Sequence, residues 1–270
     1  MNRKFMLVVL AALGVAVFSL TSQAEVYVGR KDASTAPLER IDHSEWNRLL
    51  QKYVNNDGRV DYRSWHRNAA DRRALEKYLG HLSSGATGST TDRNAQLAFW
   101  INAYNAVTVH GILNEYPTTS IRNHTARLFG YNIWKHLQLY VDGRPYSLNH
   151  IEHEILRKMH EPRIHFAIVC ASIGCPRLLN EAYTADRVQE QLEANALDFF
   201  SRSQNFQYRN GEFALSSILD WFGEDFGSSQ SQQLTTISAW LPPGQARQAA
   251  ATGRGNVSYL DYDWNLNAQE

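Results

Sequence analysis

The two cysteines of this chain lie close together in the stretch His165-Phe-Ala-Ile-Val-Cys-Ala-Ser-Ile-Gly-Cys-Pro176. Cys170 is a candidate nucleophile, because a thiolate attacks carbonyl carbons and the small residues after it leave room for a substrate. Backbone N–H groups of the same turn could stabilise an oxyanion. Cys175 is either a resolving thiol or the second half of a disulfide. Because such a bridge closes a very small loop, it would shape the turn more than it would hold the fold.

A catalytic cysteine needs a partner that lowers the pKa of its thiol, and histidine is the usual one. His153 lies on the helix expected just before this stretch, so we favour it as the base, although a buried structural role fits it equally well. His165 is nearer in sequence, but residues 164–169 are expected to form a buried strand. Five residues of strand would place His165 about 16 Å from Cys170, which favours a structural role for His165.

Neighbouring polar residues have structural explanations that compete with catalytic ones. Glu152 follows Asn149 at the spacing of a capping box, which favours helix capping over catalysis. Asn102 and Asn105 are three residues apart and lie on one side of a long apolar helix. They could orient an imidazole or stabilise an oxyanion, but buried amides more often tie two elements together. Asp263 could orient a histidine, although an exposed strand edge explains it more simply.

Composition and spacing argue against several kinds of function. The chain has 27 basic and 27 acidic residues, so its charge gives no case for binding nucleic acid or an anionic membrane. Its ten histidines do not fall at a recognised metal-ligand spacing. The sequence also lacks a glycine-rich phosphate loop and a dinucleotide fingerprint. We therefore expect no metal and no cofactor.

Residues 1–24 have the three parts of a secretory signal. Two basic residues come first, residues 5–20 are almost wholly apolar, and Ser22-Gln23-Ala24 is a small-residue cleavage site. A membrane anchor is the alternative, but the cleavage site favours removal. We expect a mature chain that begins at Glu25, carries a net charge of −2, is periplasmic or secreted, and has no stable membrane span.

Hydrophobic periodicity and turn signals predict an α+β fold, with a small, mainly antiparallel sheet surrounded by many helices. Residues 25–40 are expected to form a loose N-terminus, and residues 41–267 a single domain. Two hairpins are expected around Asp142-Gly143 and Asn210-Gly211. The expected helices are residues 42–53, 69–82, 91–116, 149–159, 184–203, 218–226 and 230–241. The expected strands are residues 138–141, 145–148, 164–169, 206–208, 212–215 and 257–264.

Four motifs occur in order along the chain: Phe99-Trp-Ile-Asn-Ala-Tyr-Asn105, Leu148-Asn-His-Ile-Glu-His153, His165-Phe-Ala-Ile-Val-Cys170 with Cys175-Pro176, and Tyr262-Asp-Trp-Asn-Leu-Asn267. This set resembles the DUF547 family, a domain of unknown function, over residues 41–267. The family supplies no established reaction. The resemblance implies a relationship to papain- and transglutaminase-like cysteine hydrolase folds, and with it a cysteine–histidine site.

Two hypotheses about function follow. In the first, the protein is a cysteine-dependent hydrolase or acyltransferase that acts on peptide or amide bonds of a peptide or envelope component. Cys170 attacks, His153 accepts its proton, and the polar residues Asn102, Asn105 and Asp263 support the reaction. In the second, the protein is a non-enzymatic periplasmic binding domain with a structural Cys170–Cys175 disulfide. A thiol–disulfide exchanger is disfavoured, because the cysteine spacing is not Cys-x-x-Cys.

Overall fold

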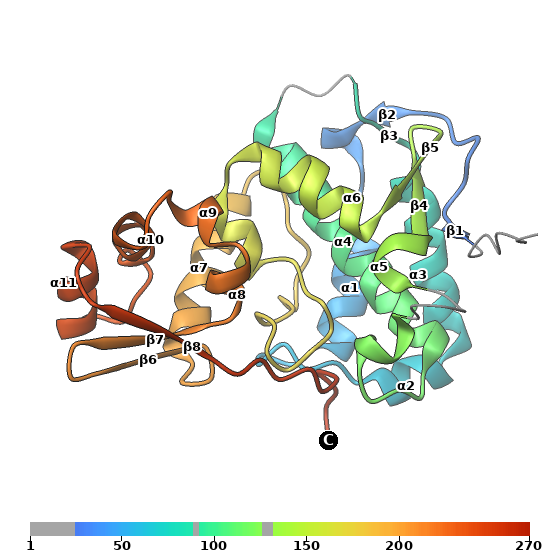
Figure 1. The fold of residues 1–270 in the computed structure, drawn as a ribbon. Helices are drawn as coiled ribbons and strands as arrows, with labels where there is room; N and C mark the ends of the chain where they lie inside the picture. Colours follow the sequence, from blue (N-terminus) through green and yellow to red (C-terminus); the bar gives the residue numbers. More distant parts are fainter. Residues whose placement is uncertain (1–24, 89–91, 126–131) are drawn as a thin grey trace, which may run out of the picture.

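The structure is a computed structural model that describes residues 25–88, 92–125 and 132–270 (Figure 1). The predicted secretory signal lies outside these residues. Within them, helices surround three small sheets, which confirms the α+β prediction. The prediction of one mainly antiparallel sheet was less accurate. Each of the two three-stranded sheets is an antiparallel hairpin that gains a third strand in parallel, and the two-stranded sheet is parallel.

The larger of two hydrophobic cores is built on the long helix α4, Arg93–Glu115. Nearly all of α4 after its first turn is buried, because apolar residues surround the helix on every side. Helices α2 (Tyr62–Arg67) and α3 (Ala69–Leu82) pack against it, and α1 (Ser44–Tyr53) packs against both of them. The prediction of a helix over residues 69–82 is therefore confirmed, and α4 agrees closely with the expected helix.

A hairpin lies beside this core. Strands β4 (Leu137–Val141) and β5 (Arg144–Ser147) are joined by Asp142 and Gly143, which have φ values of 54° and 71°. A two-residue turn with both φ values positive is the type that matches strand twist, and the sequence predicted it. Strand β1 (Val26–Val28) pairs with β4, and β2 (Ala36–Pro37) pairs with β3 (Gly85–Ala86). Two parts of the segment expected to be loose, residues 26–28 and 36–37, are therefore held by strand pairing.

The smaller core lies at the other end of the molecule (Figure 1). Helix α7 (Val188–Ser201) packs there against the predicted hairpin of β6 (Phe206–Arg209) and β7 (Glu212–Ser216). Strand β8 (Asn256–Leu260) pairs with β7 in parallel and ends four residues before the expected strand does. Four short helices complete this part: α8 (Ile218–Trp221), α9 (Gly223–Phe226), α10 (Gln230–Ile237) and α11 (Gln245–Ala251).

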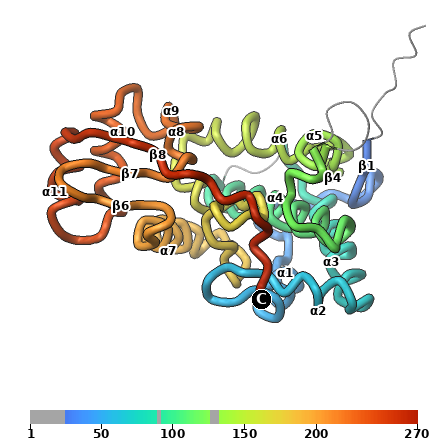
Figure 2. The backbone as a smooth tube through the Cα atoms, turned by 60° about the horizontal axis from the view of Figure 1, so that its bottom comes forward, coloured from blue at the N-terminus to red at the C-terminus, as the bar shows by residue number. Residues whose placement is uncertain are grey.

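The segment between the cores is mostly irregular. It begins with α6 (Leu148–His150), a π-helix over Ile151–Leu156, a 3-10 turn over Arg157–Met159 and a 3-10 helix over Pro162–Phe166. After Phe166 no helix or strand is present until Val188 (yellow in Figure 2). The prediction of a strand over residues 164–169 is therefore wrong, and so is the distance argument that rested on it.

Candidate functional site

One cavity of about 230 Å³ brings together the residues with the most reactive chemistry. Its polar lining includes Glu152, His153, His165, Cys170 and Cys175. Aromatic side chains form much of the remaining wall, namely Tyr104, Trp134, Trp221, Phe222, Tyr262 and Trp264. A larger cavity, of about 670 Å³, lies beside α1 and the start of α4 and contains none of the candidate site residues. We therefore place the candidate site in the smaller cavity.

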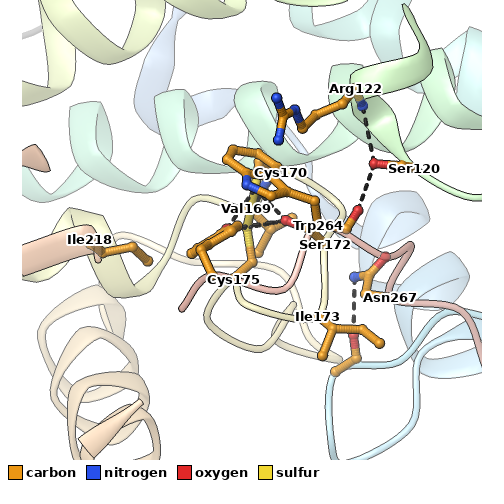
Figure 3. Close-up of a disulfide and its surroundings, with 12 residues drawn as sticks. Ser120, Arg122, Val169, Cys170, Ser172, Ile173, Cys175, Ile218, Trp264 and Asn267 are labelled. Carbon is orange, nitrogen blue, oxygen red and sulfur yellow. Dashed lines mark hydrogen bonds between the residues drawn. A yellow bond between two sulfur atoms is a disulfide. The ribbon is translucent and has the colours of Figure 1, made fainter. Parts of the chain in front are cut away.

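The two cysteines form a disulfide in the wall of this cavity (Figure 3). Tyr262 Oη lies 3.0 Å from Cys170 Sγ and 3.1 Å from Cys175 Sγ, and Ser172 Oγ lies 2.8 Å from Cys170 Sγ. The residue after Cys170, Ala171, has a φ of 57°, a conformation that costs energy in a residue with a Cβ atom. In this oxidised state Cys170 Sγ therefore contacts the hydroxyl groups of Ser172 and Tyr262 rather than an imidazole.

The turn that carries the disulfide is held from two sides. On one side, Asn105 Nδ2 donates to Ala167 O at 2.9 Å, and Asn105 Oδ1 accepts from Val169 N at 3.0 Å. On the other side, residues 171–174 exchange backbone hydrogen bonds of 2.8 to 3.0 Å with residues 263–267. These bonds replace the ladder that a strand would have provided, because buried backbone groups must find partners.

Gly174 fits this turn because a side chain there would meet the C-terminal tail. A Cβ atom on Gly174 would lie 3.0 Å from Asp263 N and 3.0 Å from the ring of Tyr262. Gly174 N donates to Asp263 O at 2.8 Å. The small residue therefore lets the tail approach closely and bring Tyr262 against the disulfide.

His165 is oriented by a carboxylate. Its Nε2 lies 2.7 Å from Asp225 Oδ2, its ring stacks on Phe222 with centroids 4.4 Å apart, and only 3% of the residue is exposed. Burial lowers the pKa of His165, and the hydrogen bond to Asp225 opposes that change. Burial alone would raise the pKa of Asp225, but hydrogen bonds from His165 and Arg157 bring it well below its ordinary value. A neutral His165 donates through Nε2, which leaves Nδ1 free to accept a proton.

In His153 the two ring nitrogens have the opposite roles from those in His165. Arg157 Nη1 lies 3.2 Å from His153 Nδ1, and an arginine can only donate, so Nδ1 is the acceptor. In its neutral form His153 therefore carries its proton on Nε2. Arg157 also binds Asp225, with Nε 2.6 Å from Oδ2 and Nη2 2.9 Å from Oδ1. One arginine thus connects the two histidines through the same carboxylate.

Glu152 has a partner other than the one the sequence indicated. Ser147, not Asn149, caps the helix, because its side chain accepts from His150 N. Glu152 Oε2 accepts from Tyr104 Oη at 3.0 Å, and burial raises the pKa of this carboxyl. The capping role that we preferred for Glu152 is therefore wrong, and Glu152 presents a half-buried carboxyl group to the cavity.

The remaining site candidates make structural contacts outside the cavity lining. Asn102 Nδ2 donates to Tyr183 O, and Asn102 Oδ1 accepts from Tyr183 N. Asp263 Oδ1 accepts from the backbone N–H of Asn265. Asn105, described above, ties the cysteine turn to α4. The structure brings Cys170, His153 and Cys175 into one cavity, and their catalytic roles stay predictions.

Sequence reasoning favoured a structural role for His165 on a distance argument that proved wrong, and it did not identify Asp225 or the tyrosine hydroxyl at the disulfide. Tyr262 had a signal, because it begins the motif Tyr262-Asp-Trp, but attention went to Asp263. Asp225 had none, since 60 residues separate it from His165.

The fold and the cavity define an α+β protein with a disulfide, two imidazoles and a half-buried carboxyl group in one aromatic pocket. Residues 88–200 match the family model of DUF547, described as "Protein of unknown function, DUF547". This match confirms the family prediction, and the matched segment holds every motif on which it rested except the last, Tyr262-Asp-Trp-Asn-Leu-Asn267. The comparisons with curated proteins and with solved structures returned no match.

Two features of the described residues bear on partners. No helix among them is both long and apolar enough to cross a membrane. Within the same residues, no group of three or more histidine, cysteine, aspartate or glutamate side chains is placed to hold a metal ion.

Proposed function

We propose that this protein is an exported binding protein whose aromatic pocket takes a small ligand, with the Cys170–Cys175 disulfide as a structural part of the pocket wall. The disulfide and its contacts carry the proposal. Both cysteines are used in the bond, and the hydroxyl groups of Ser172 and Tyr262 pack against the sulfur atoms. Export through the signal over residues 1–24 would deliver the chain to a compartment in which such a bond persists.

The state of the two thiols tests this proposal. Protein purified from the periplasm without reductant should begin at Glu25 by mass spectrometry and contain no thiol that reacts with a colorimetric thiol reagent before denaturation or after it. Reduction should lower stability without creating turnover of amide or ester substrates. Two thiols that are readily alkylated in the native protein would contradict the proposal.

A cysteine-dependent hydrolase or acyltransferase is the second candidate. The observation that favours it is His165, a base that lines the same cavity as Cys170 and is oriented by its hydrogen bond to Asp225. After reduction, the thiolate of Cys170 would add to an amide carbonyl. The C–N bond would break as an imidazolium protonates the leaving amine, and water or an acceptor would then release the acyl group. His153 or His165 would move the proton.

Activity under mild reductant separates the two candidates. For the enzyme, Cys170→Ala should abolish turnover and leave folding intact, whereas Cys175→Ala should retain it. Since His165 Nδ1 is free to accept a proton and His153 Nδ1 accepts from Arg157, His165→Gln should lower turnover more than His153→Gln. Unchanged turnover in Cys170→Ala would overturn this mechanism.

A further inference from the structure

An aromatic wall extends from the cavity to the surface. Trp221, Tyr262 and Trp264 all line the cavity and contact one another, with ring centroids 4.5 to 5.7 Å apart. Trp221 is 46% exposed, the largest exposed fraction among the large apolar side chains of the described residues, together with that of Tyr27. A stacked tryptophan pair that stays open to water at the edge of a cavity is suited to hold a flat ligand face.

A positive charge lies beside this wall. Arg122 Cζ is 5.1 Å from the centre of the Trp264 ring, and Figure 3 shows its side chain extended over the indole. Arg122 is exposed, and its guanidinium forms no ion pair with a carboxylate of the described residues. Ser120 Oγ donates to Trp264 O at 2.6 Å and ties the segment that carries Arg122 to the tail that carries Trp264. The charge and the wall are therefore held together and remain available to a ligand.

Besides His165, three further polar side chains line the cavity. Asn149, Glu152 and His153 come from the segment around α6 and line the same space as the aromatic wall. An amide, a carboxyl and an imidazole offer both donors and acceptors. The volume of about 230 Å³ is below the range of drug-sized sites, so the enclosed part fits a ligand of about one ring.

We propose that the ligand is a saccharide with a carboxylate group. A sugar ring has an apolar C–H face, which would pack on Trp264 and Trp221, and a rim of hydroxyl groups, which would bond to Asn149, Glu152 and His153. The sugar carboxylate would pair with Arg122, since a guanidinium binds a carboxylate through two parallel hydrogen bonds. This inference rests on the proposed binding function and names its ligand class.

Two other ligand classes fit the same residues less well. A planar aromatic acid would use the wall and Arg122, but it would leave the three polar side chains without enough partners. A cationic amine would suit the aromatic wall and Glu152, but the charge of Arg122 beside Trp264 would repel it. The combination of an aromatic face, three polar groups and one cation therefore favours an acidic sugar.

Binding is tested with oligosaccharides that contain glucuronate, galacturonate or N-acetylmuramate, each beside its neutral methyl ester. Tryptophan fluorescence and calorimetry on the mature chain report the affinity. We expect at least one acidic sugar to bind, and its ester to bind about tenfold more weakly. Arg122→Gln should remove that preference, and Trp264→Ala should weaken both forms at least tenfold. Arg144→Gln and Tyr27→Ala, at exposed positions away from the cavity, should change neither affinity.

A fragment library of aromatic acids, amines and neutral sugars is tested on the same protein. Binding of an aromatic acid or an amine in the cavity, with no acidic sugar bound, would overturn the saccharide inference and leave the binding function standing. Equal affinity for acid and ester in the parent protein would also overturn it. If no compound binds and the reduced protein hydrolyses amides, the proposed binding function itself falls.

Discussion

The two hydrophobic cores differ in how they are built. Among the described residues, the larger core has 47 buried residues, of which nine are aromatic, and it surrounds the long helix α4. The smaller core has only 15 buried residues, but seven are aromatic. Large aromatic side chains bury much area per residue, so a small set of short elements can still form a core. The candidate site lies where the two cores meet, and both contribute to its wall.

The smaller core helps to hold the residues of the candidate site in place. Phe166 belongs to that core and follows His165 directly, whereas the next residue, Ala167, belongs to the larger one. The boundary between the cores therefore passes through the segment that leads to Cys170. We infer that changes in the smaller core affect the site more than equal changes far away in the larger core.

The largest effect is expected from Phe166→Ala. Phe166 is fully buried, and its ring lies 4.7 to 5.7 Å, centroid to centroid, from four other aromatic rings. Loss of a buried phenylalanine side chain costs about 3–5 kcal/mol of unfolding free energy. Urea unfolding followed by tryptophan fluorescence measures this loss, and thiol accessibility measures the effect on the disulfide turn.

Phe99→Ala is the matched variant in the larger core, since Phe99 is equally buried. We expect a similar loss of stability but native-like protection of the Cys170–Cys175 bond against reductant. If both variants expose the disulfide equally, the site does not depend on one core more than on the other.

The second largest effect is expected from Asn105→Ala. Asn105 connects the larger core to the cysteine turn through Ala167 and Val169, and the substitution leaves two buried backbone groups without partners. Each such group costs about 1–3 kcal/mol, so we expect a loss of at least about 2 kcal/mol. Asn123→Ala, on the exposed 3-10 helix η2 (Ile121–His124), should cost less than about 0.5 kcal/mol. A cost for Asn105→Ala as small as this would show that the turn is held by other contacts.

Local sequence patterns predicted the elements whose partners are near in sequence. The helix over Ala69–Leu82 and the hairpin turns at Asp142-Gly143 and Asn210-Gly211 follow from periodicity and turn chemistry. The strand expected over residues 164–169 failed, because a short apolar run fits either a strand or any other buried segment. Its backbone instead bonds to side chains 29 to 64 residues away, namely Asn195 and Asn105.

The candidate site, like the fold, could be predicted only in part from the sequence. Cysteine chemistry and the order of elements directed attention to Cys170 and His153, and both line the cavity. The pairing of His165 with Asp225 was not predictable, since it depends on how the smaller core packs against the segment between the cores. A single sequence contains no signal for a contact of that kind.

The third largest effect is a pH dependence of the unfolding free energy that comes from a histidine beside the larger core. His110 lies on α4 beside the larger core, and burial, with a smaller contribution from Arg72, lowers its pKa from 6.5 to about 4. The unfolded chain therefore binds this proton at a higher pH than the folded chain does, so stability falls as the pH drops from about 6.5 towards 4. Between pH 7 and pH 5 we expect a loss of about 2 kcal/mol from this group.

Variants at two histidines measure this pH dependence. His110→Gln should flatten the curve of unfolding free energy against pH between 7 and 5. His165→Gln should change the slope less, because the hydrogen bond from His165 to Asp225 opposes the effect of burial on the His165 pKa. An unchanged slope in His110→Gln would assign the acid sensitivity to other groups.

The smallest effect is expected from reduction of the disulfide. Cys170 and Cys175 are five positions apart, so the bond removes little chain entropy from the unfolded state, and its loss should cost about 1–2 kcal/mol. The turn keeps its backbone bonds to residues 263–267 after reduction, so the loss of hydrogen-exchange protection should be confined to residues 169–176 and that tail. The Cys170→Ala, Cys175→Ala double variant should show the same local change without reductant. Loss of protection throughout α4 would instead mean that this short bridge stabilises the larger core. The stability of the cysteine turn would then be coupled to that of the larger core more strongly than their packing indicates.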